Sequence, residues 1–239
     1  MTDAASREDF REIARLVRPG ARVLDVGCGE GLLLELLARE KGVDGRGIEI
    51  SPEGVSACLA RGLSVVQGDA DRDLDDFLAG AFDYVILSQT LQAVLEPRHV
   101  LGELLRIGEQ AIVSLPNFGH WRVRLDLLIH GRMPVTGALP EPWWATPNIH
   151  LCTLRDFTHL CGDLDLRIDA CAALAAGRPA RPADPLSPLE TWRAEAALFL
   201  LSRGKGSWRQ SRGQPARADS AAAPEPELAG PGDEPRRSA

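Results

Sequence analysis

The sequence predicts an α/β protein built on a doubly wound, mostly parallel sheet of seven strands, the last of them antiparallel. Two observations predict this fold class. Short apolar runs alternate with stretches of helical periodicity at the spacing of βαβ units over residues 22–114. The first run leads into a glycine-rich turn, DVGCGEG at 25–31, which opens a helix. Right-handed crossovers would then place helices on both faces of the sheet.

The first half of the chain is predicted element by element. An opening helix is expected because Phe10, Ile13, Leu16 and Val17 recur at helical spacing before a Pro-Gly pair. Ser51 can cap a helix that has Pro52 at its first position, and Pro97 is placed in the same way. We expect strands at 22–26, 45–50, 63–67, 82–87 and 110–114, and helices at 31–39, from 52 onward, at 74–78 and at 97–106.

The regular alternation stops after Pro116 for about 35 residues. It resumes with a helix near 153–161, a strand near 166–174 and a final strand near 195–201. The stretch 177–188 is rich in Pro, Ala and Gly and predicts a long loop. A strand that arrives after so long a connection is expected to insert antiparallel to its neighbours.

The composition changes near the C-terminus. Residues 203–239 contain five Gly and five Pro, and Trp208 and Leu228 are the large apolar side chains there. Such a segment buries too little apolar surface to offset its chain entropy, so we expect a folded domain at 1–202 and a disordered tail at 203–239. The whole chain has a net charge of −7, and the tail contributes +2, so the predicted domain carries −9. An acidic domain is a poor binder of phosphate backbones, and no nucleic-acid partner is expected.

The sequence also argues against a membrane protein and a metal site. No apolar run reaches the roughly 18 residues that a membrane span needs, and four acidic residues fall within the first 20 positions, so neither a span nor a signal peptide is predicted. The five cysteines include no CxxC pair, which favours reduced thiols over disulfides or zinc. We therefore expect a cytoplasmic protein without a metal.

The glycine-rich turn points to a ligand. Its spacing is GxGxG and not the GxGxxG of dinucleotide sites. Asp25, two residues before the first glycine, would repel a pyrophosphate but suits a cationic or hydroxyl-rich ligand. Glu49 ends the next strand, where a carboxylate can accept hydrogen bonds from both hydroxyls of a ribose. Asp69 follows the third strand, where a base edge could be read. A mere tight turn or a dinucleotide site are the alternatives.

Acidic residues at three successive strand ends resemble the Rossmann-like fold of the class I S-adenosylmethionine-dependent methyltransferases. The resemblance implies that Asp25 orients the loop and the methionyl part of the ligand, that Glu49 holds the ribose, and that Asp69 and Ala70 flank the adenine. Cys28 precedes a helix N-terminus that would lower its pKa, and we interpret it as a small side chain facing the ligand. The expected cofactor-binding residues are Asp25, Gly27, Cys28, Gly29, Glu49, Ile50, Asp69, Ala70 and Ser88.

Further motifs are similar to one narrower family, the methionine biosynthesis protein MetW. They are RGIEI at 46–50, FDYVILSQTLQ at 82–92, LPNFGHWR at 115–122, GRMPV at 131–135 and TPNIHLC at 146–152. The resemblance covers roughly residues 12–202. It implies an S-adenosylmethionine-binding protein of methionine biosynthesis that supports or regulates a homoserine O-acyltransferase as its partner subunit. The alternative is a stand-alone methyltransferase acting on a small molecule, since the sequence leaves open whether a methyl group is transferred.

Polar and aromatic residues after the fifth strand predict a substrate or partner pocket. Its candidate residues are Gln89, Asn117, His120, Trp121, Arg122, Asn148 and His150. His120 or His150 could act as a general base, because imidazole titrates near neutral pH. The structural alternative is that Asn and His beside Pro hydrogen-bond the loop backbone. Trp143 and Trp144 are adjacent, so at least one is expected to be exposed, either to anchor a partner or to pack in the loop.

Overall fold

The computed structural model describes residues 4–137, 139–175, 178–185 and 187–204. The strands are β1 (Arg22–Val26), β2 (Asp44–Glu49), β3 (Ser64–Gln67), β4 (Phe82–Ser88), β5 (Gly108–Pro116), β6 (Leu166–Ala175), β7 (Arg178–Pro182) and β8 (Ala196–Arg203). The helices are α1 (Ala4–Leu16), α2 (Leu32–Lys41), α3 (Pro52–Ala60), the 3₁₀ turn η1 (Leu74–Asp76), α4 (Pro97–Ile107), α5 (Trp121–His130), α6 (Leu154–Asp163) and α7 (Pro188–Arg193). The predicted tail falls outside the described residues from position 205 onward.

The strands form one sheet in the order β3-β2-β1-β4-β5-β8-β6-β7. Strands β1 to β5 are parallel to one another, and β8 inserts antiparallel between β5 and β6. The α/β class, the mostly parallel sheet and the antiparallel last strand are therefore confirmed. Strand order reverses between β1 and β4, which in open α/β sheets marks the place where ligands bind, beyond the carboxyl ends of the strands.

The sheet has eight strands and not the predicted seven. The additional strand, β7, pairs antiparallel with β6 at the edge of the sheet and lies within the stretch predicted as a loop. Its sequence, RPARP, has no alternation of apolar and polar residues, because four of its five positions are exposed. An edge strand also tolerates proline, since one side of its backbone has no neighbour to bond. Strand β7 thus has neither the apolar run nor the alternating pattern that predicts a strand from sequence.

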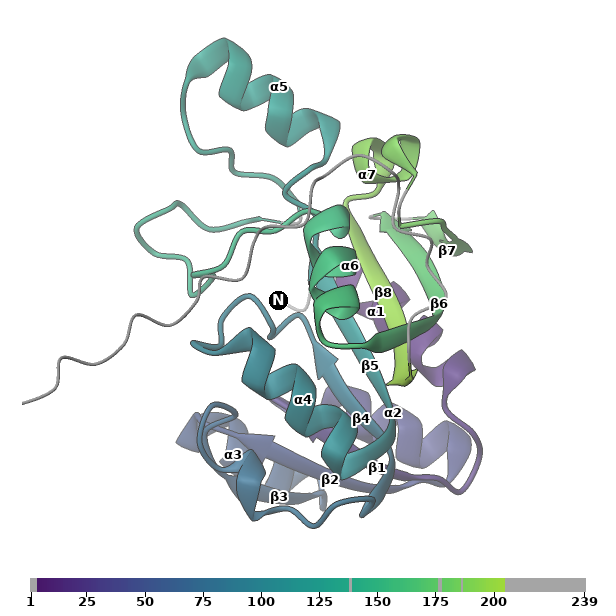
Figure 1. The fold of residues 1–239 in the computed structure, drawn as a ribbon. Coiled ribbons are helices and arrows are strands. Elements are labelled where there is room, and N and C mark those ends of the chain that lie inside the picture. The colour runs from purple at the N-terminus through teal and green to yellow at the C-terminus, as the bar shows by residue number, and fades with distance from the viewer. Residues whose placement is uncertain (1–3, 138, 176–177, 186, 205–239) are drawn as a thin grey trace, which may run out of the picture. The chain divides into compact units, whose positions relative to one another are not determined.

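Side chains alternate between two helical layers on the two faces of the sheet. In β4, Val85 and Leu87 pack against α4 and α6, whereas Tyr84 and Ile86 face α1 and α2. Figure 1 shows these two layers on opposite faces of the sheet. Because strand side chains alternate with a period of two, the position of a residue near a strand end also says which helical layer it faces.

Two helices were not predicted, and α5 is the larger. It falls in the stretch where the alternation stops, and Val123 is its buried residue, while Leu125, Leu128 and Ile129 are exposed. A helix without a buried apolar stripe gives no periodic signal. Figure 1 shows α5 standing apart from the two layers that cover the sheet. Among the described helices, none is both long and apolar enough to cross a membrane.

Candidate functional site

The glycine loop between β1 and α2 has the backbone that only glycine adopts easily. Gly27, Gly29 and Gly31 have φ angles of 72°, 54° and 78°. A Cβ on Gly27 would lie 2.9 Å from the Thr90 hydroxyl oxygen, so this glycine lets the loop after β4 approach closely. A Cβ on Gly29 would meet no atom within 4 Å. The Cα of Gly29 therefore faces free space, although its N–H and carbonyl are hydrogen-bonded within the protein.

Glu49 joins the glycine loop to the start of α3. Its Oε2 accepts a hydrogen bond of 2.8 Å from the Gly29 N–H, and its Oε1 accepts one of 2.9 Å from the Ser51 N–H. Ser51 caps α3 as predicted, because its hydroxyl accepts the Gly54 N–H at 3.2 Å. Each carboxylate oxygen has two acceptor positions, so Glu49 retains acceptors for two further donors, as a pair of ribose hydroxyls would require.

Two glycines that are not among the predicted site residues make this junction possible. A Cβ on Gly54 would lie 2.8 Å from Glu49 Cγ and 2.9 Å from the Gly29 carbonyl oxygen. A Cβ on Gly47 would lie 2.5 Å from the sulfur of Cys28. Both are spaces that a side chain would fill, and neither glycine has a left-handed φ that could have marked it in a turn motif.

Cys28 differs from its prediction. Its sulfur lies 3.7 Å from that of Cys58, and both residues belong to the core under α2 and α3. Burial raises the pKa of the Cys28 thiol, and the negative charge of Asp25 raises it further. The expected lowering by a helix N-terminus is therefore wrong, because desolvation outweighs it. Cys28 contributes its backbone to the loop, while its side chain fills the core.

The adenine-side candidates lie at the ends of β2 and β3. These strand ends are neighbours, since Glu49 pairs with Gln67 and the Gly68 N–H donates to the Glu49 carbonyl. Ile50 is 63% exposed just beyond β2, which leaves an apolar surface at this edge. Asp69 Oδ1 accepts the Asp71 N–H at 2.9 Å, so this carboxylate shapes its own turn, and Ala70 packs against the core.

Asp25 is buried at the end of β1. It is 3% exposed. Burial raises its pKa to about 7, and the negative charges of Glu49 and then Asp9 act in the same direction. A carboxyl group with this pKa is easily ionised by a cation placed beside it, because the cation favours the charged form.

Ser88 and Gln89 follow at the end of β4. The Ser88 hydroxyl donates a hydrogen bond of 2.8 Å to Asp9 Oδ2, so this hydroxyl is already engaged within the protein. Gln89 has a φ of 52°, an uncommon conformation for a residue with a side chain, and its N–H donates to the Ser114 carbonyl at 3.0 Å. Such strain is concentrated at functional sites. The Gln89 side chain is exposed, and Gln89 is not among the residues that line the recess described below.

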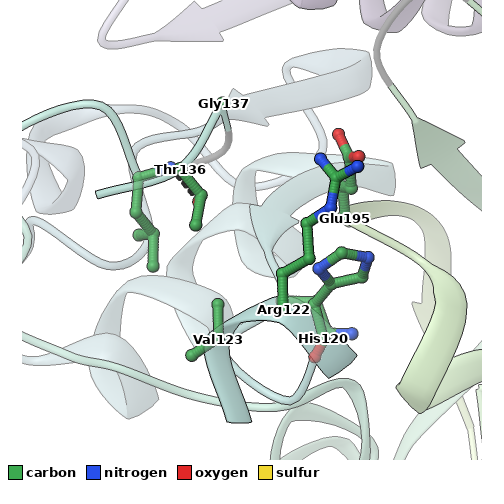
Figure 2. A pocket seen from close by; sticks show the side chains of 8 residues that line it. His120, Arg122, Val123, Thr136, Gly137 and Glu195 are labelled. Carbon is green, nitrogen blue, oxygen red and sulfur yellow. Dashed lines mark hydrogen bonds between the residues drawn. The ribbon is translucent and has the colours of Figure 1, made fainter. Parts of the chain in front are cut away.

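The pocket residues of the later segment fall into two groups. Asn117, His120 and Arg122 line one recess, with Glu195 from the start of β8. Figure 2 shows the Arg122 side chain extending toward Glu195 above the His120 ring, with Val123 and Thr136 opposite. The recess has a volume of about 20 Å³, which is room for about one water molecule. In this structure the recess does not admit a small-molecule substrate.

The contacts of His120 and Asn117 within the protein indicate a structural role for both side chains. Burial lowers the pKa of His120; the negative charge of Glu195 opposes this shift, and the positive charge of Arg122 adds to it. The Asn117 amide donates to the Thr191 and Ala194 carbonyls at 2.7 and 2.8 Å, and its oxygen accepts the Gly119 N–H at 2.9 Å. Asn117 therefore fixes the loop between β5 and α5, which is the alternative that the sequence left open.

His150 and Asn148 are not among the residues that line this recess. The N–H of His150 donates to the Gln92 carbonyl at 2.9 Å, and its Nε2 lies 3.3 Å from the Leu95 carbonyl oxygen, so this segment packs along the loop after β4. Asn148 is half-buried, and its N–H donates to Thr146 Oγ1 at 3.1 Å. The two histidines are thus held by different loops.

Aromatic side chains gather around α5. The Trp121 ring lies 6.0 Å from that of Trp192, and the Arg122 guanidinium lies 5.3 Å over the Trp121 ring. Trp143 and Trp144 are 68% and 73% exposed, so the prediction that at least one is exposed is confirmed.

Sequence reasoning missed two acidic residues at this edge. Asp71 accepts hydrogen bonds from the Leu95 and Glu96 N–H groups at 2.9 and 3.0 Å and so ties the loop after β3 to the loop after β4. Asp9 is 1% exposed and accepts hydrogen bonds from Ser88 and Ser114. A signal for Asp9 existed, because it lies four residues before Ile13 on the stripe of α1 that packs on the sheet.

Comparison with known proteins decides the family. The family described as methionine biosynthesis protein MetW matches residues 7–201. The chain belongs to the MetW family. The match includes the glycine loop, the strand-end acids and the α5 segment.

Two relatives place the family match in context. A bifunctional methionine biosynthesis protein MetXA/MetW from Rhodopirellula baltica is 36% identical over 177 residues, which is 70% of this chain and 28% of that protein. A ubiquinone biosynthesis O-methyltransferase from Xanthomonas oryzae is 39% identical over 112 residues, or 44% of this chain and 46% of that protein. The chain thus spans less than half the length of these relatives.

Solved structures agree on the fold. A SAM-dependent methyltransferase from Thermotoga maritima superposes with a TM-score of 0.60 over 83% of this chain and 91% of that one, at 14% identity. At this identity the likeness shows the fold alone, because one fold supports many functions. The predicted methyltransferase-type fold is confirmed.

Proposed function

We propose that this protein binds S-adenosylmethionine at the carboxyl edge of the sheet and acts in methionine biosynthesis as a partner subunit of a homoserine O-acyltransferase. The observation that supports the partnership best is the Rhodopirellula relative, in which MetXA and MetW are joined in one chain. Covalent linkage keeps two modules at high effective concentration, and such fusions favour modules that work together. Membership of the MetW family supports the pathway.

The residues at the edge suit S-adenosylmethionine. Glu49 retains acceptors toward a ribose, the Cα of Gly29 faces free space, and Ile50 offers an apolar surface to an adenine. The bound group would supply a methyl activated by a sulfonium. In a regulatory role that methyl need not react. As the product of the pathway's downstream steps, the ligand would report pathway output to the acyltransferase, provided that its affinity differs between free and partnered protein.

The test uses the full chain and purified homoserine O-acyltransferase from the same host. Acyltransferase rate and thermal stability are measured alone, with this protein, and with this protein plus S-adenosylmethionine. We expect a stable complex and a changed rate, and we expect the Glu49→Ala variant to lose the effect of the added ligand. An acyltransferase whose rate and stability are the same in all three samples would refute the partnership.

A second function is supported by the Xanthomonas O-methyltransferase, whose similarity covers 112 residues. In a stand-alone small-molecule methyltransferase, alignment and desolvation do most of the catalytic work, so the absence of a clear acid–base pair is no obstacle. Labelled-methyl transfer over a cell extract tests this function. Label incorporation no higher than with Glu49→Ala would count against it.

A further inference from the structure

One buried carboxylate has no role in the site as described so far. Asp9, on the sheet-facing stripe of α1, is 1% exposed. Its Oδ2 accepts hydrogen bonds of 2.8 Å from both the Ser88 and Ser114 hydroxyls. Its Oδ1 has no hydrogen-bond partner among the residues that the structure describes. Buried polar atoms are nearly always paired, so the orphaned oxygen indicates a missing partner.

The strand register places this carboxylate beside Asp25. Ser88 of β4 pairs with Ser114 of β5. Each serine lies two residues after a position that faces α1, so both serines lie on the α1 face of the sheet. Asp25 pairs with Ile86, two residues before Ser88, and its own neighbour on the same face, Val23, also packs against α1 and α2. By the alternation of strand side chains, Asp9 and Asp25 therefore share the same face at the carboxyl edge of the sheet.

Within the part of the chain that the structure describes, no cationic side chain pairs with these two carboxylates. Neither residue takes part in the ion pairs found among the described residues. Two buried acids that face each other, one from α1 and one from the end of β1, repel each other unless a positive group or a proton lies between them. An ammonium group fits best, since it brings one positive charge and three hydrogen-bond donors to a set of acceptors.

We propose that Asp9 and Asp25 together bind the ammonium group of the methionine part of S-adenosylmethionine, with Asp9 reaching the ligand from α1, outside the glycine-loop motif. The inference rests on the proposed binding of that ligand. It makes α1 part of the binding site, because the ligand would bond to a helix that the Ser88 and Ser114 hydroxyls already hold at the ends of β4 and β5.

The experiment compares two nucleosides that share adenine, ribose and a neutral sulfur. S-adenosylhomocysteine has the amino-acid part with its ammonium group, and 5′-methylthioadenosine lacks it. Titration calorimetry with Asp9→Asn is expected to show at least a tenfold weaker affinity for S-adenosylhomocysteine, because a charge-assisted bond is lost, and an affinity for 5′-methylthioadenosine within twofold of wild type. Glu12→Gln is the matched control on the same helix, since Glu12 pairs with Arg15, and it should bind both as wild type does.

Every outcome of this experiment supports or overturns the proposal. Unchanged binding of S-adenosylhomocysteine by Asp9→Asn would show that Asp9 is a protonated structural residue, and tighter binding would show that it faces the ligand's carboxylate; either result overturns the proposal. Wild-type protein that binds neither nucleoside would instead overturn the proposed function and the inference with it. If Asp9→Asn does not fold, Ser114→Ala removes one of the two hydroxyls that hold Asp9. Ser114→Ala should selectively weaken the binding of S-adenosylhomocysteine. Equal affinity of the wild-type protein for both nucleosides would again overturn the inference.

Discussion

Asp25 is the residue whose chemistry the fold changes most. The same side chain would be fully ionised at pH 7 in an unfolded chain, whereas burial, Glu49 and Asp9 raise its pKa to about 7 in the folded protein. The ligand-free protein therefore holds a carboxyl group that is only half ionised at neutral pH. A site that keeps a costly charge in place for a ligand trades stability for function.

This predicts a pH-dependent effect of Asp25→Asn on stability. Since the folded pKa lies above the unfolded value of 3.8, the wild-type protein loses stability as pH rises from about 4 to about 7. The neutral variant does not undergo this loss. Its advantage in free energy of unfolding should grow through that window, reach on the order of 4 kcal/mol, and level off above it. Urea denaturation of the ligand-free proteins between pH 4 and pH 8 measures it. A constant difference across this range would contradict the assignment.

The junction between the glycine loop and α3 is a property of elements rather than of one side chain. Glu49 bonds the Gly29 and Ser51 N–H groups, and the junction closes only because Gly54 has no side chain. The loop and the helix start are thus held at one spacing, which fixes the position of the Glu49 carboxylate in the proposed site.

Gly54→Ala should disrupt this junction. The added Cβ would lie 2.9 Å from the Gly29 carbonyl oxygen, and backbone cannot move aside cheaply. We expect a destabilisation of about 1–3 kcal/mol and at least a tenfold weaker affinity for S-adenosylhomocysteine. Gly102→Ala is the control, because Gly102 lies on the exposed side of α4 and a Cβ there meets no atom within 4 Å, and it should be neutral or stabilise by about 0.5–1 kcal/mol. Equal behaviour of the two variants, measured by denaturation and calorimetry, would exclude this explanation.

The α5 helix shows the opposite situation, because most of its large apolar side chains are exposed. Leu128 and Ile129 are 83% and 63% exposed, and Trp143 and Trp144 stand exposed in the loop that follows. Apolar patches of this kind on folded proteins mark interaction surfaces. If the acyltransferase is the partner, this segment is where we expect it to dock.

A double variant, Leu128→Glu with Ile129→Glu, tests the docking surface. Burying two carboxylates in an interface is costly, so capture of the acyltransferase should fall at least tenfold, while S-adenosylhomocysteine binding stays the same. Leu78→Glu is the matched control, since Leu78 is 79% exposed outside this segment. Quantitative pull-down with both variants makes the comparison. Loss of capture in Leu78→Glu as well, or in neither, would rule out α5 as the interface.

At the scale of the whole molecule, β8 is the last strand of the sheet along the described chain, and it ends at Arg203. Strand β8 pairs with β5 and β6 along its length, and the Arg203 side chain donates to the Leu105 carbonyl at 2.8 Å. The sites described above all lie before this point. The proposed division of the chain near residue 203 follows from composition and from this last pairing.

A chain truncated after Gly204 should therefore keep its function. We expect S-adenosylhomocysteine affinity within twofold of the full chain and the same thermal midpoint within about 2 °C, because no core strand is shortened. Calorimetry and thermal denaturation of the two chains test this. A truncated protein that binds more than tenfold more weakly would show that residues 205–239 belong to the site.

The sequence by itself determined what depends on neighbours in the chain. Glycines that need a left-handed φ, the Ser51 cap, and the apolar runs of β1 to β6 and β8 are local patterns, and they were enough to predict the fold class. A carboxylate at the end of each early strand is also a local pattern, and the ligand site that it predicts stays a prediction. Strand β7 and helix α5 escaped because both lie largely exposed, and exposure erases the periodic signal.

Only the tertiary structure decided how distant residues meet. Asp9 reaches Ser88 and Ser114 across 79 and 105 positions of sequence, and it does so because sheet register and helix packing bring them together. The same packing directed Cys28 into the core, made Asn117 a loop anchor and held His120 and His150 on different loops. A pattern of residue types states which chemistry is available, but burial and register determine which side chains face a common ligand.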